Sequence, residues 1–239
     1  MKYVKSFEPI ESDPRILTKL MHRLGVRETF CFDDVLDYEE ESRQPALALI
    51  VIFPESLDDE LEKAAVEANR APIINDNIKF LKQTIDNSCG LVAVLHCVLN
   101  TVAVNSISKS QGLRLFKKID EPIQGHNSIL YNAIRSSKGV MKFLEESKEL
   151  EFEYQSAVES GETEIPDEVK YHYVALIGYQ DHNLYELDGE RSSPLIKGSS
   201  AKVGYILHEA EQMAQIIKSF TRGRMDCSFF KLKAMDEII

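Results

Sequence analysis

Cys89 is the residue of this chain best placed to act as a nucleophile. A polar loop ends at Asn87-Ser88, and Cys89 follows it directly. The segment 90–100 is apolar on nearly all sides, which predicts a buried helix with this cysteine in its first turn. Asn87 or Ser88 can cap the helix by accepting a hydrogen bond from its free N–H groups. The helix dipole there favours the thiolate, the reactive form. A free cysteine is more often a small core residue, so this interpretation depends on finding partners for the thiol.

A cysteine nucleophile needs a base, and His172 is the candidate among six histidines. His96 lies seven residues after Cys89 on the same helix, and at about 1.5 Å per residue it is roughly 10 Å away. Four further histidines lie in charged helices, in a turn or beside a helix cap: His22, His126, His182 and His208. His172 instead lies within an apolar strand, where a histidine is unusual unless its nitrogens are satisfied. A structural core histidine remains the alternative unless a partner is found.

Asp188 is the predicted partner of His172. Two strand-like segments, 169–178 and 184–188, flank a polar turn and predict an antiparallel hairpin. If the turn centres on Gln180, His172 and Asp188 lie directly opposite each other, with Cβ atoms roughly 4.5–5.5 Å apart. A register shift of one residue would place the two side chains on opposite faces.

Gln83 lies six residues before Cys89, close enough to direct its side-chain amide at the same place. This amide and the backbone N–H of Cys89 would stabilise the oxyanion that develops when a thiolate attacks a carbonyl group. The sequence therefore predicts thiol acyl transfer of the papain type, with Cys89 as nucleophile, His172 as base and Asp188 as the group that orients the base.

The elements that must position these residues alternate between helix and strand. The apolar run 46–53 predicts a strand buried on both faces, hence central in a sheet that helices cover. Besides the 90–100 helix we expect helical segments at 14–24, 57–69, 113–119, about 127–144 with a break at Gly139, and 205–221, and further strands at 30–32, 169–178, 184–188, 193–196 and 227–234. The 57–69 helix is highly charged and has its apolar residues along one side, as in a surface helix. The fold class is α/β (α+β), with a largely antiparallel sheet between helices.

The composition limits the classes of protein that fit. At 239 residues and 44% hydrophobic content, the chain can form a single domain, 1–239, and it has no repeat, linker, signal peptide or apolar run of membrane-spanning length. Its net charge of −11 argues against nucleic acid or an anionic membrane as partner. The segment 145–168 has ten acidic residues and one lysine, which indicates a solvated face or a surface for a basic ligand. The four cysteines are widely spaced, as expected for free thiols in a reducing compartment.

Several motifs together resemble the ubiquitin C-terminal hydrolases, the UCH family of cysteine deubiquitinases. The resemblance spans the whole chain, and the length is similar to that of the short, single-domain L3-type members. The motifs that carry it are Gln83 with Asn87-Ser88-Cys89-Gly90, His172-Tyr173-Val174-Ala175-Leu176, Leu184-Tyr185-Glu186-Leu187-Asp188-Gly189 and the N-terminal Pro9-Ile10-Glu11-Ser12-Asp13-Pro14. The spacing from His172 to Asp188 is one residue longer than we expect for animal relatives, which predicts a larger turn and an intact triad.

This resemblance implies a papain-like cysteine protease fold, in which helices flank a central antiparallel sheet and the backbone is knotted. It implies hydrolysis of bonds at the C-terminal glycine of ubiquitin through an acyl-enzyme, with no metal or cofactor. It also implies a crossover loop at about 150–166 that lies over the active site and limits the leaving group to small adducts, short peptides, amines or thiols.

By the same resemblance, Glu11 and Asp34 meet the basic tail of ubiquitin, with Asp33 as the alternative to Asp34. Asn87 is a further candidate for contact with substrate. We expect a monomeric enzyme in the cytoplasm, with the nucleus as a second location. The alternatives are a hydrolase that prefers a ubiquitin-like protein such as NEDD8, a non-catalytic ubiquitin-binding module, and a thiol hydrolase or transferase of small peptides.

Overall fold

The computed structural model describes residues 3–35, 46–73, 75–102, 123, 127–163, 171–179, 181–199, 216, 220 and 226–235. The helical segment expected at 113–119 lies outside these residues, as does all of the one expected at 205–221 except Ile216 and Phe220, which are helical. The knotted course expected of the backbone includes segments 36–45, 103–122 and 201–215, which also lie outside them. None of the helices in the described ranges combines the length and apolar character that a membrane span requires.

The main sheet has six strands within the described ranges, and every neighbouring pair is antiparallel. Its order is β2 (Phe30–Asp34), β8 (Ser228–Ala234), β3 (Ala48–Pro54), β5 (Tyr171–Gly178), β6 (Asn183–Leu187) and β7 (Leu195–Ser199). The apolar run 46–53 thus forms an interior strand, as predicted, because β8 and β5 pair with its two edges. In a second, two-stranded sheet β1 (Lys5–Ser6) pairs in parallel with β4 (Ile85–Asp86). Strand β4 lies just before the predicted nucleophile in the sequence.

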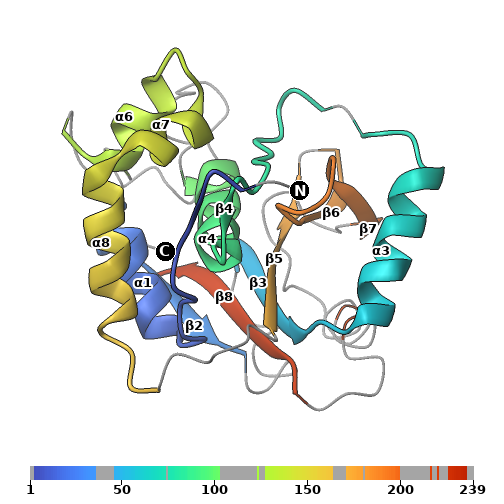
Figure 1. Cartoon of the computed structure of the whole chain (residues 1–239), viewed down its shortest axis with the longest axis horizontal. Coiled ribbons are helices and arrows are strands. Elements are labelled where there is room, and N and C mark those ends of the chain that lie inside the picture. Colours follow the sequence, from blue (N-terminus) through green and yellow to red (C-terminus); the bar gives the residue numbers. More distant parts are fainter. Residues whose placement is uncertain are drawn as a thin grey trace.

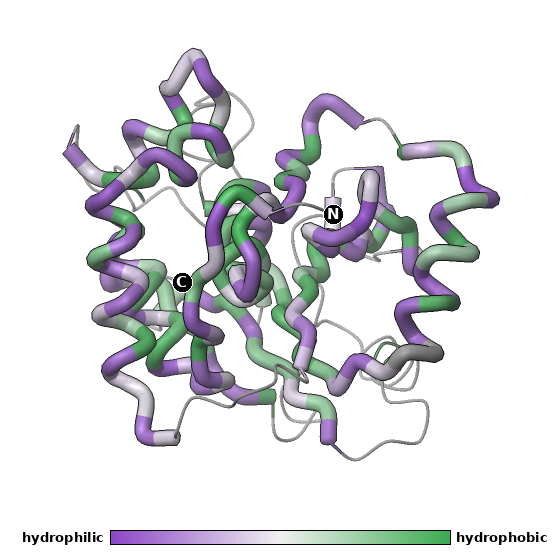
Figure 2. The backbone as a smooth tube through the Cα atoms, viewed as in Figure 1, coloured by the Kyte–Doolittle hydropathy of each residue, from purple (hydrophilic) through white to green (hydrophobic). Residues whose placement is uncertain are grey.

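Helix α4 (Cys89–Asn100) lies at the centre of the molecule (Figure 1). All its residues are buried, because its sequence offers no polar face to solvent. On one side of α4 lie α1 (Pro14–Arg23), α6 (Ile129–Arg135), α7 (Val140–Glu146) and α8 (Lys148–Val158); on the other side lies α3 (Leu57–Asn69), near the β6–β7 end of the sheet (Figure 1). The hydropathy colours alternate along α3 and α8, the helices at opposite ends of the molecule (Figure 2). The fold is therefore the expected α/β arrangement of an antiparallel sheet with flanking helices.

The sequence predicts a crossover loop at about 150–166. The first part of this prediction is wrong, because helix α8 continues to Val158. Ser147 caps this helix by accepting a hydrogen bond from the backbone N–H of Leu150. Acidic residues in the first turn stabilise the helix by interacting with the positive end of its dipole. Residues at helical spacing bury one face of α8: Leu150, Tyr154, Ala157 and Val158. Residues 159–163 follow α8 as turns and bends, and residues 164–170 lie outside the described ranges.

Helix α3 does not bury the apolar side that its sequence suggests. The Leu61 side of the helix faces solvent, with Leu61 itself 61% exposed. Charged residues from the other side are largely buried instead, with exposed side-chain fractions of 14% for Lys63 and 15% for Arg70. Polar contacts therefore fix α3 to the rest of the protein, and they bring it to the site described next.

Candidate active site

Cys89 opens α4 and is buried. The predicted cap is wrong, because neither candidate side chain caps the helix. Ser88 Oγ instead donates to the backbone oxygen of Ile85 at 2.7 Å. Asn87 has a left-handed backbone (φ 56°), which asparagine tolerates well, and its side chain donates to Phe7 O at 3.1 Å. Because no side chain caps the helix, the N–H groups of its first turn can donate hydrogen bonds to a substrate oxygen.

His172 and Asp188 meet as predicted, although the strand register differs. In the structure Ala175 pairs with Leu187 across β5 and β6, a register two residues away from the predicted one. Because side chains alternate with a period of two, this shift leaves His172 and Asp188 on the same face, in a diagonal arrangement. His172 Nε2 donates to Asp188 Oδ1 at 2.9 Å. The predicted pair is therefore confirmed, and the direct opposition of the two residues is wrong.

The other nitrogen of the imidazole, Nδ1, is available to the cysteine. Cys89 lies close enough to His172 to help raise the pKa of the ring, and because Nε2 bonds to Asp188, Nδ1 is the nitrogen left for the thiol. Burial lowers the pKa of His172, but the charge and hydrogen bond of Asp188 and the interaction with Cys89 outweigh it and raise this pKa well above its usual value. Burial raises the pKa of Asp188, but the charges of His172 and Lys63 hold it far below its usual value. Asp188 therefore favours the charged imidazolium form of the ring beside Cys89.

Gln83 is only 3% exposed, and it lies with Val92 of the first turns of α4 around Gly189. Its backbone N–H donates to Gly189 O at 2.8 Å. A Cβ atom on residue 189 would lie 3.0 Å from Gln83 Cβ and 2.8 Å from Val92 Cγ1, so only glycine fits without displacing them. Gln83 Oε1 is buried without a hydrogen-bond partner among the described residues. A buried acceptor without a partner is uncommon unless water satisfies it. The donor that an oxyanion would need is the other end of the amide, Nε2.

His96 is a site residue whose role the sequence analysis missed. It is fully buried, and its Nε2 accepts a hydrogen bond from the backbone N–H of Leu81 at 2.9 Å while Nδ1 donates to Leu187 O at 3.2 Å. It therefore links the segment that leads to Gln83 with the end of β6 that leads to Asp188. Burial lowers the pKa of His96 to about 4, although the charge of Asp188 and the bond to Leu187 O oppose this. The signal for this role is that His96 interrupts an otherwise apolar helix.

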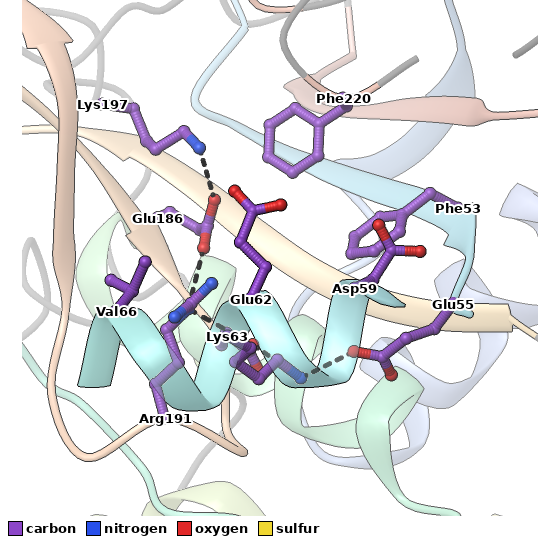
Figure 3. Close-up of a pocket in the computed structure, with 11 residues that line it drawn as sticks. Phe53, Glu55, Asp59, Glu62, Lys63, Val66, Glu186, Arg191, Lys197 and Phe220 are labelled. Atoms are coloured by element: carbon purple, nitrogen blue, oxygen red, sulfur yellow. Dashed lines mark hydrogen bonds and ion pairs between the residues drawn. The ribbon is translucent and has the colours of Figure 1, made fainter. Parts of the chain in front are cut away.

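A cluster of charges behind Asp188 is the second feature that the sequence analysis missed. Lys63 Nζ lies 2.9 Å from Glu55 Oε1, 2.7 Å from Glu190 Oε2 and 3.3 Å from Asp188 Oδ2. The cluster borders the pocket of Figure 3, which is lined by Phe53, Glu55, Asp59, Glu62, Lys63, Val66, Glu186, Asp188, Arg191, Lys197 and Phe220. The sequence carries no local signal for these contacts, because Lys63 is one of many charges on α3.

Part of this cluster has the donor atoms of a metal site. Glu55, His172 and Glu190 each offer a ligand atom, and within the described ranges these atoms lie within 4.8 Å of one another. The Lys63 ammonium already lies at hydrogen-bond distance from both carboxylates. A metal ion here would have to displace that ammonium and compete with Asp188 and Cys89 for the imidazole, so the arrangement fits an internal ion cluster better than a metal centre.

The N-terminal segment that carries Glu11 is fixed across the start of α4. The hydroxyl of Tyr173 donates to Ile10 O at 3.0 Å, and that of Tyr154 donates to Glu8 O at 3.0 Å. A Cβ atom on residue 90 would lie 2.5 Å from Ile10 Cγ2, so Gly90 lets this segment approach the helix. The close approach places the N-terminal segment beside the active site.

Glu11 contacts the segment that follows α8. Its Oε2 accepts hydrogen bonds from the backbone N–H groups of Glu162 at 2.7 Å and Thr163 at 3.3 Å. Glu11 therefore holds the start of the loop beyond α8, in addition to its predicted contact with substrate. That contact stays a prediction, as does the contact predicted for Asn87, whose side-chain amide is bonded to Phe7 O.

The two adjacent acidic residues at the end of β2 differ in their surroundings. Asp33 forms an ion pair with Lys233 at 2.6 Å. Burial raises the pKa of Asp34, as do the nearby charges of Asp33 and Asp13, and Arg15 lowers it only in part. Asp34 is thus in an environment with excess negative charge, where an added cation is favourable. This difference favours Asp34 over Asp33 as the residue that meets a basic ligand.

A cysteine at the start of a central helix, beside a histidine–aspartate pair from the sheet, defines a papain-like cysteine peptidase. Comparisons with known proteins narrow this class. The family model for ubiquitin carboxyl-terminal hydrolase, family 1, matches residues 7–222. Ubiquitin carboxyl-terminal hydrolase isozyme L1 from Macaca fascicularis is 29% identical over 219 residues, which cover 90% of this chain and 91% of the relative. A ubiquitin carboxyl-terminal hydrolase from Aplysia californica is 27% identical over 219 residues, with coverage of 89% and 93%.

The fold is also similar to that of a solved relative. The catalytic domain of Trichinella spiralis UCH37, determined bound to ubiquitin vinyl methyl ester, has a TM-score of 0.62, 21% identity and 96% coverage of both chains. The chain therefore belongs to the ubiquitin carboxyl-terminal hydrolases, family 1, as the sequence motifs predict. It is a cysteine-type thiol peptidase of the deubiquitinase class.

Proposed function

We propose that this protein hydrolyses bonds to the C-terminal glycine of ubiquitin with Cys89 as nucleophile. The observation that carries this proposal is that His172 Nε2 bonds to Asp188 Oδ1 at 2.9 Å while the same ring interacts with Cys89. The Cys89 thiolate attacks the glycine carbonyl, and the amide of Gln83 and the backbone N–H of Cys89 stabilise the oxyanion. The imidazolium gives its proton to the departing amine or thiol, leaving a thioester. The neutral ring then takes a proton from water, which attacks the thioester and releases ubiquitin and the thiolate.

Turnover of a fluorogenic amide of ubiquitin tests this mechanism. Replacing Cys89 by alanine should abolish turnover while ubiquitin binding remains measurable, because the binding surface extends well beyond one sulfur atom. His172→Ala should also abolish turnover, and Asp188→Ala should lower it less if that residue only orients the ring. A wild-type protein that binds ubiquitin but neither turns over the amide nor reacts with an electrophilic C-terminal ubiquitin probe would be a non-catalytic binding module instead.

The same assay separates the possible acyl substrates. Ubiquitin and NEDD8 that carry the same C-terminal fluorophore should be compared with a peptide of the ubiquitin tail alone. We expect the highest kcat/KM for folded ubiquitin, because a protein substrate contacts surface beyond the cleft. Preference for NEDD8, or equal turnover of the tail peptide, would assign the enzyme to one of the alternative classes.

Acidic residues near the cleft support recognition of a basic tail. Asp34 lies among like charges, whereas Asp33 is already paired with Lys233. We expect Asp34→Asn to raise KM on the order of tenfold, corresponding to about 1.4 kcal/mol, with a smaller change in kcat. The matched variant Asp33→Asn should change KM much less. Equal effects of the two variants would remove Asp34 from the binding surface. Asp34 is a sharper test than Glu11, whose replacement would also release the amides of residues 162 and 163.

The short connection after α8 supports a preference for small leaving groups. Between Val158 and Tyr171 the chain has twelve residues, which extend to at most roughly 40 Å before both ends are anchored. A folded second ubiquitin would not pass beneath such a segment easily, whereas a short peptide, amine or thiol would. We propose that the enzyme cleaves small C-terminal adducts rapidly and ubiquitin chains poorly.

A loop insertion tests this preference. A flexible Gly/Ser stretch placed after Thr163, beyond the amides that Glu11 holds, should increase cleavage of diubiquitin and leave turnover of the small amide nearly unchanged. The same stretch placed after Lys138, in the exposed turn between α6 and α7, is the control and should change neither. Rapid cleavage of diubiquitin by the wild type, or no gain from the insertion, would refute the size limit.

We further propose that the protein is a monomer of the cytoplasm, with the nucleus as a second location. None of the cysteines of the described ranges, Cys31, Cys89, Cys97 and Cys227, forms a disulfide, as suits a reducing compartment. Light scattering of the purified protein and fluorescence imaging of the tagged chain would test the two statements. A stable dimer or a secreted protein would contradict them.

A further inference from the structure

Lys63 lies at the point where α3 meets the catalytic carboxylate. Its ammonium has three carboxylates within 3.3 Å, and its side chain is 14% exposed. Figure 3 shows it between Glu55 and the segment that follows β6. An ammonium so placed is held by charge and hydrogen bonds, and its removal would leave several carboxylates close together without a cation.

The two oxygens of Asp188 have different partners. Oδ1 accepts hydrogen bonds from His172 Nε2 and from the backbone N–H of Glu190, both at 2.9 Å. Oδ2 faces the cations, with Lys63 Nζ at 3.3 Å and Arg191 Nε at 3.6 Å. Lys63 therefore helps to fix the rotation of the carboxylate that in turn orients the imidazole.

Glu55 is a second carboxylate beside the imidazole. Its Oε2 lies 3.9 Å from His172 Nδ1, the nitrogen that faces Cys89, while its Oε1 is bound by Lys63 at 2.9 Å. A carboxylate at this distance from an imidazolium attracts it, and small movements would let Glu55 compete with the thiolate for the same proton. The ion pair with Lys63 holds Glu55 back from this competing contact.

We propose that Lys63 is a positioning residue for the catalytic triad, which orients Asp188 and prevents Glu55 from drawing His172 Nδ1 away from Cys89. The proposal rests on the proposed role of Cys89 as nucleophile. Lys63 touches neither the reacting sulfur nor the expected path of the substrate carbonyl, so it acts through Asp188 and Glu55.

The charges around His172 determine the sign of the expected effects. The charged groups nearest the ring and its partners are Cys89 of α4, Glu55 after β3, Asp188, Glu190 and Arg191 after β6, and Lys63 of α3. Lys82 and His96 also act on Asp188, and Tyr3, Tyr154 and Tyr173 act on Cys89. Removing a cation from this set raises the affinity of the site for protons, and removing an anion lowers it. Lys63→Met should therefore move the pH dependence of the Cys89–His172 pair to higher pH, and Glu55→Gln should move it to lower pH.

The experiment measures the rate at which iodoacetamide alkylates Cys89 between about pH 4 and 10, followed by mass spectrometry. This readout needs no ubiquitin, so a failure of the proposed function appears separately as lack of turnover in the wild type. We expect opposite pH displacements for Lys63→Met and Glu55→Gln, and a wild-type profile for Lys63→Arg. With the ubiquitin amide, Lys63→Met should lower kcat at least tenfold and change KM less than twofold.

The double variant Lys63→Met with Glu55→Gln tests the competition directly. If Glu55 captures the ring when Lys63 is absent, removing its charge should restore a large part of the lost kcat. Arg70→Met is the matched control, since Arg70 fixes the same helix to Ser193 O at 2.8 Å and Pro194 O at 3.0 Å without touching the triad. It should leave the pH profile unchanged.

Two results would overturn the proposal. Equal losses of kcat in Lys63→Met and Arg70→Met, with both pH profiles unchanged, would show that Lys63 only anchors α3. A double variant no more active than Lys63→Met alone would show that Glu55 does not compete for the imidazole.

Discussion

His96 should make the folded protein sensitive to mild acid. Its Nε2 accepts a hydrogen bond from the backbone N–H of Leu81, and a ring that is protonated on both nitrogens cannot accept that bond. Burial lowers the pKa of His96 to about 4 in the folded state, whereas the unfolded chain has a value near 6.5. The folded state therefore binds this proton less readily than the unfolded state.

The sign and size of the effect follow from this difference. Stability from a neutral His96 is fully present above about pH 6.5 and is lost as the pH falls towards about 4. A pKa difference of one is worth about 1.4 kcal/mol, so the full loss is about 3 kcal/mol. His172 has the opposite dependence, because its raised pKa stabilises the folded state below about pH 6.5 and loses that effect as the pH rises. Below about pH 6 its contribution is nearly constant.

The measurement is the free energy of unfolding by urea at about pH 6 and about pH 4.5. The chain has no tryptophan, so far-ultraviolet circular dichroism is the suitable signal. We expect the wild type to lose about 2 kcal/mol more between these pH values than His96→Gln, whose amide offers a donor and an acceptor but does not titrate. His182→Asn, in an exposed turn with left-handed backbone, is the control and should behave as the wild type.

Equal losses in the wild type and His96→Gln would refute the reasoning. The carboxylates that also lose stability in acid are common to both proteins and cancel in the comparison. A remaining difference of less than about 0.5 kcal/mol would mean that His96 protonates in the folded state without breaking its bond to Leu81, or that this region opens before the ring titrates.

Three further results are expected. Gly189→Ala should lower kcat on the order of tenfold with little change in KM, because the new Cβ atom would displace Gln83 or Val92; an unchanged kcat in steady-state turnover would show that the amide can move without cost. Cys97→Ala should keep full turnover, since burial raises the pKa of Cys97 and keeps it a thiol, whereas Cys89→Ala should have none; a comparable loss in both would assign the wrong nucleophile. Added salt should lower kcat/KM and leave kcat nearly constant if the net charge of −11 steers a basic tail, and a salt-independent kcat/KM would count against steering.

The sequence alone was sufficient to predict the contact of His172 with Asp188 and most of the elements that carry the candidate catalytic residues. The apolar segment after Cys89 predicts a buried helix, and the structure contains it as α4. The pattern around His172 and Asp188 predicts a hairpin, and β5 and β6 form it. The predicted register is two residues off, yet the contact survives because side chains on a strand repeat every two residues. These features depend on local periodicity, which neighbouring residues along the chain encode.

The tertiary structure decided the features that depend on distant partners. Helix α8 extends into the segment predicted as a loop, because its buried face forms only by packing against the rest of the protein. Helix α3 turns its charged face inward, because Lys63 finds carboxylates that lie far along the chain, at positions 188 and 190. His96 is similar, since its partners Leu81 and Leu187 belong to separate segments. A hydrogen bond or ion pair between residues so far apart leaves no periodic pattern in the sequence. Its two partners come together only when the chain folds.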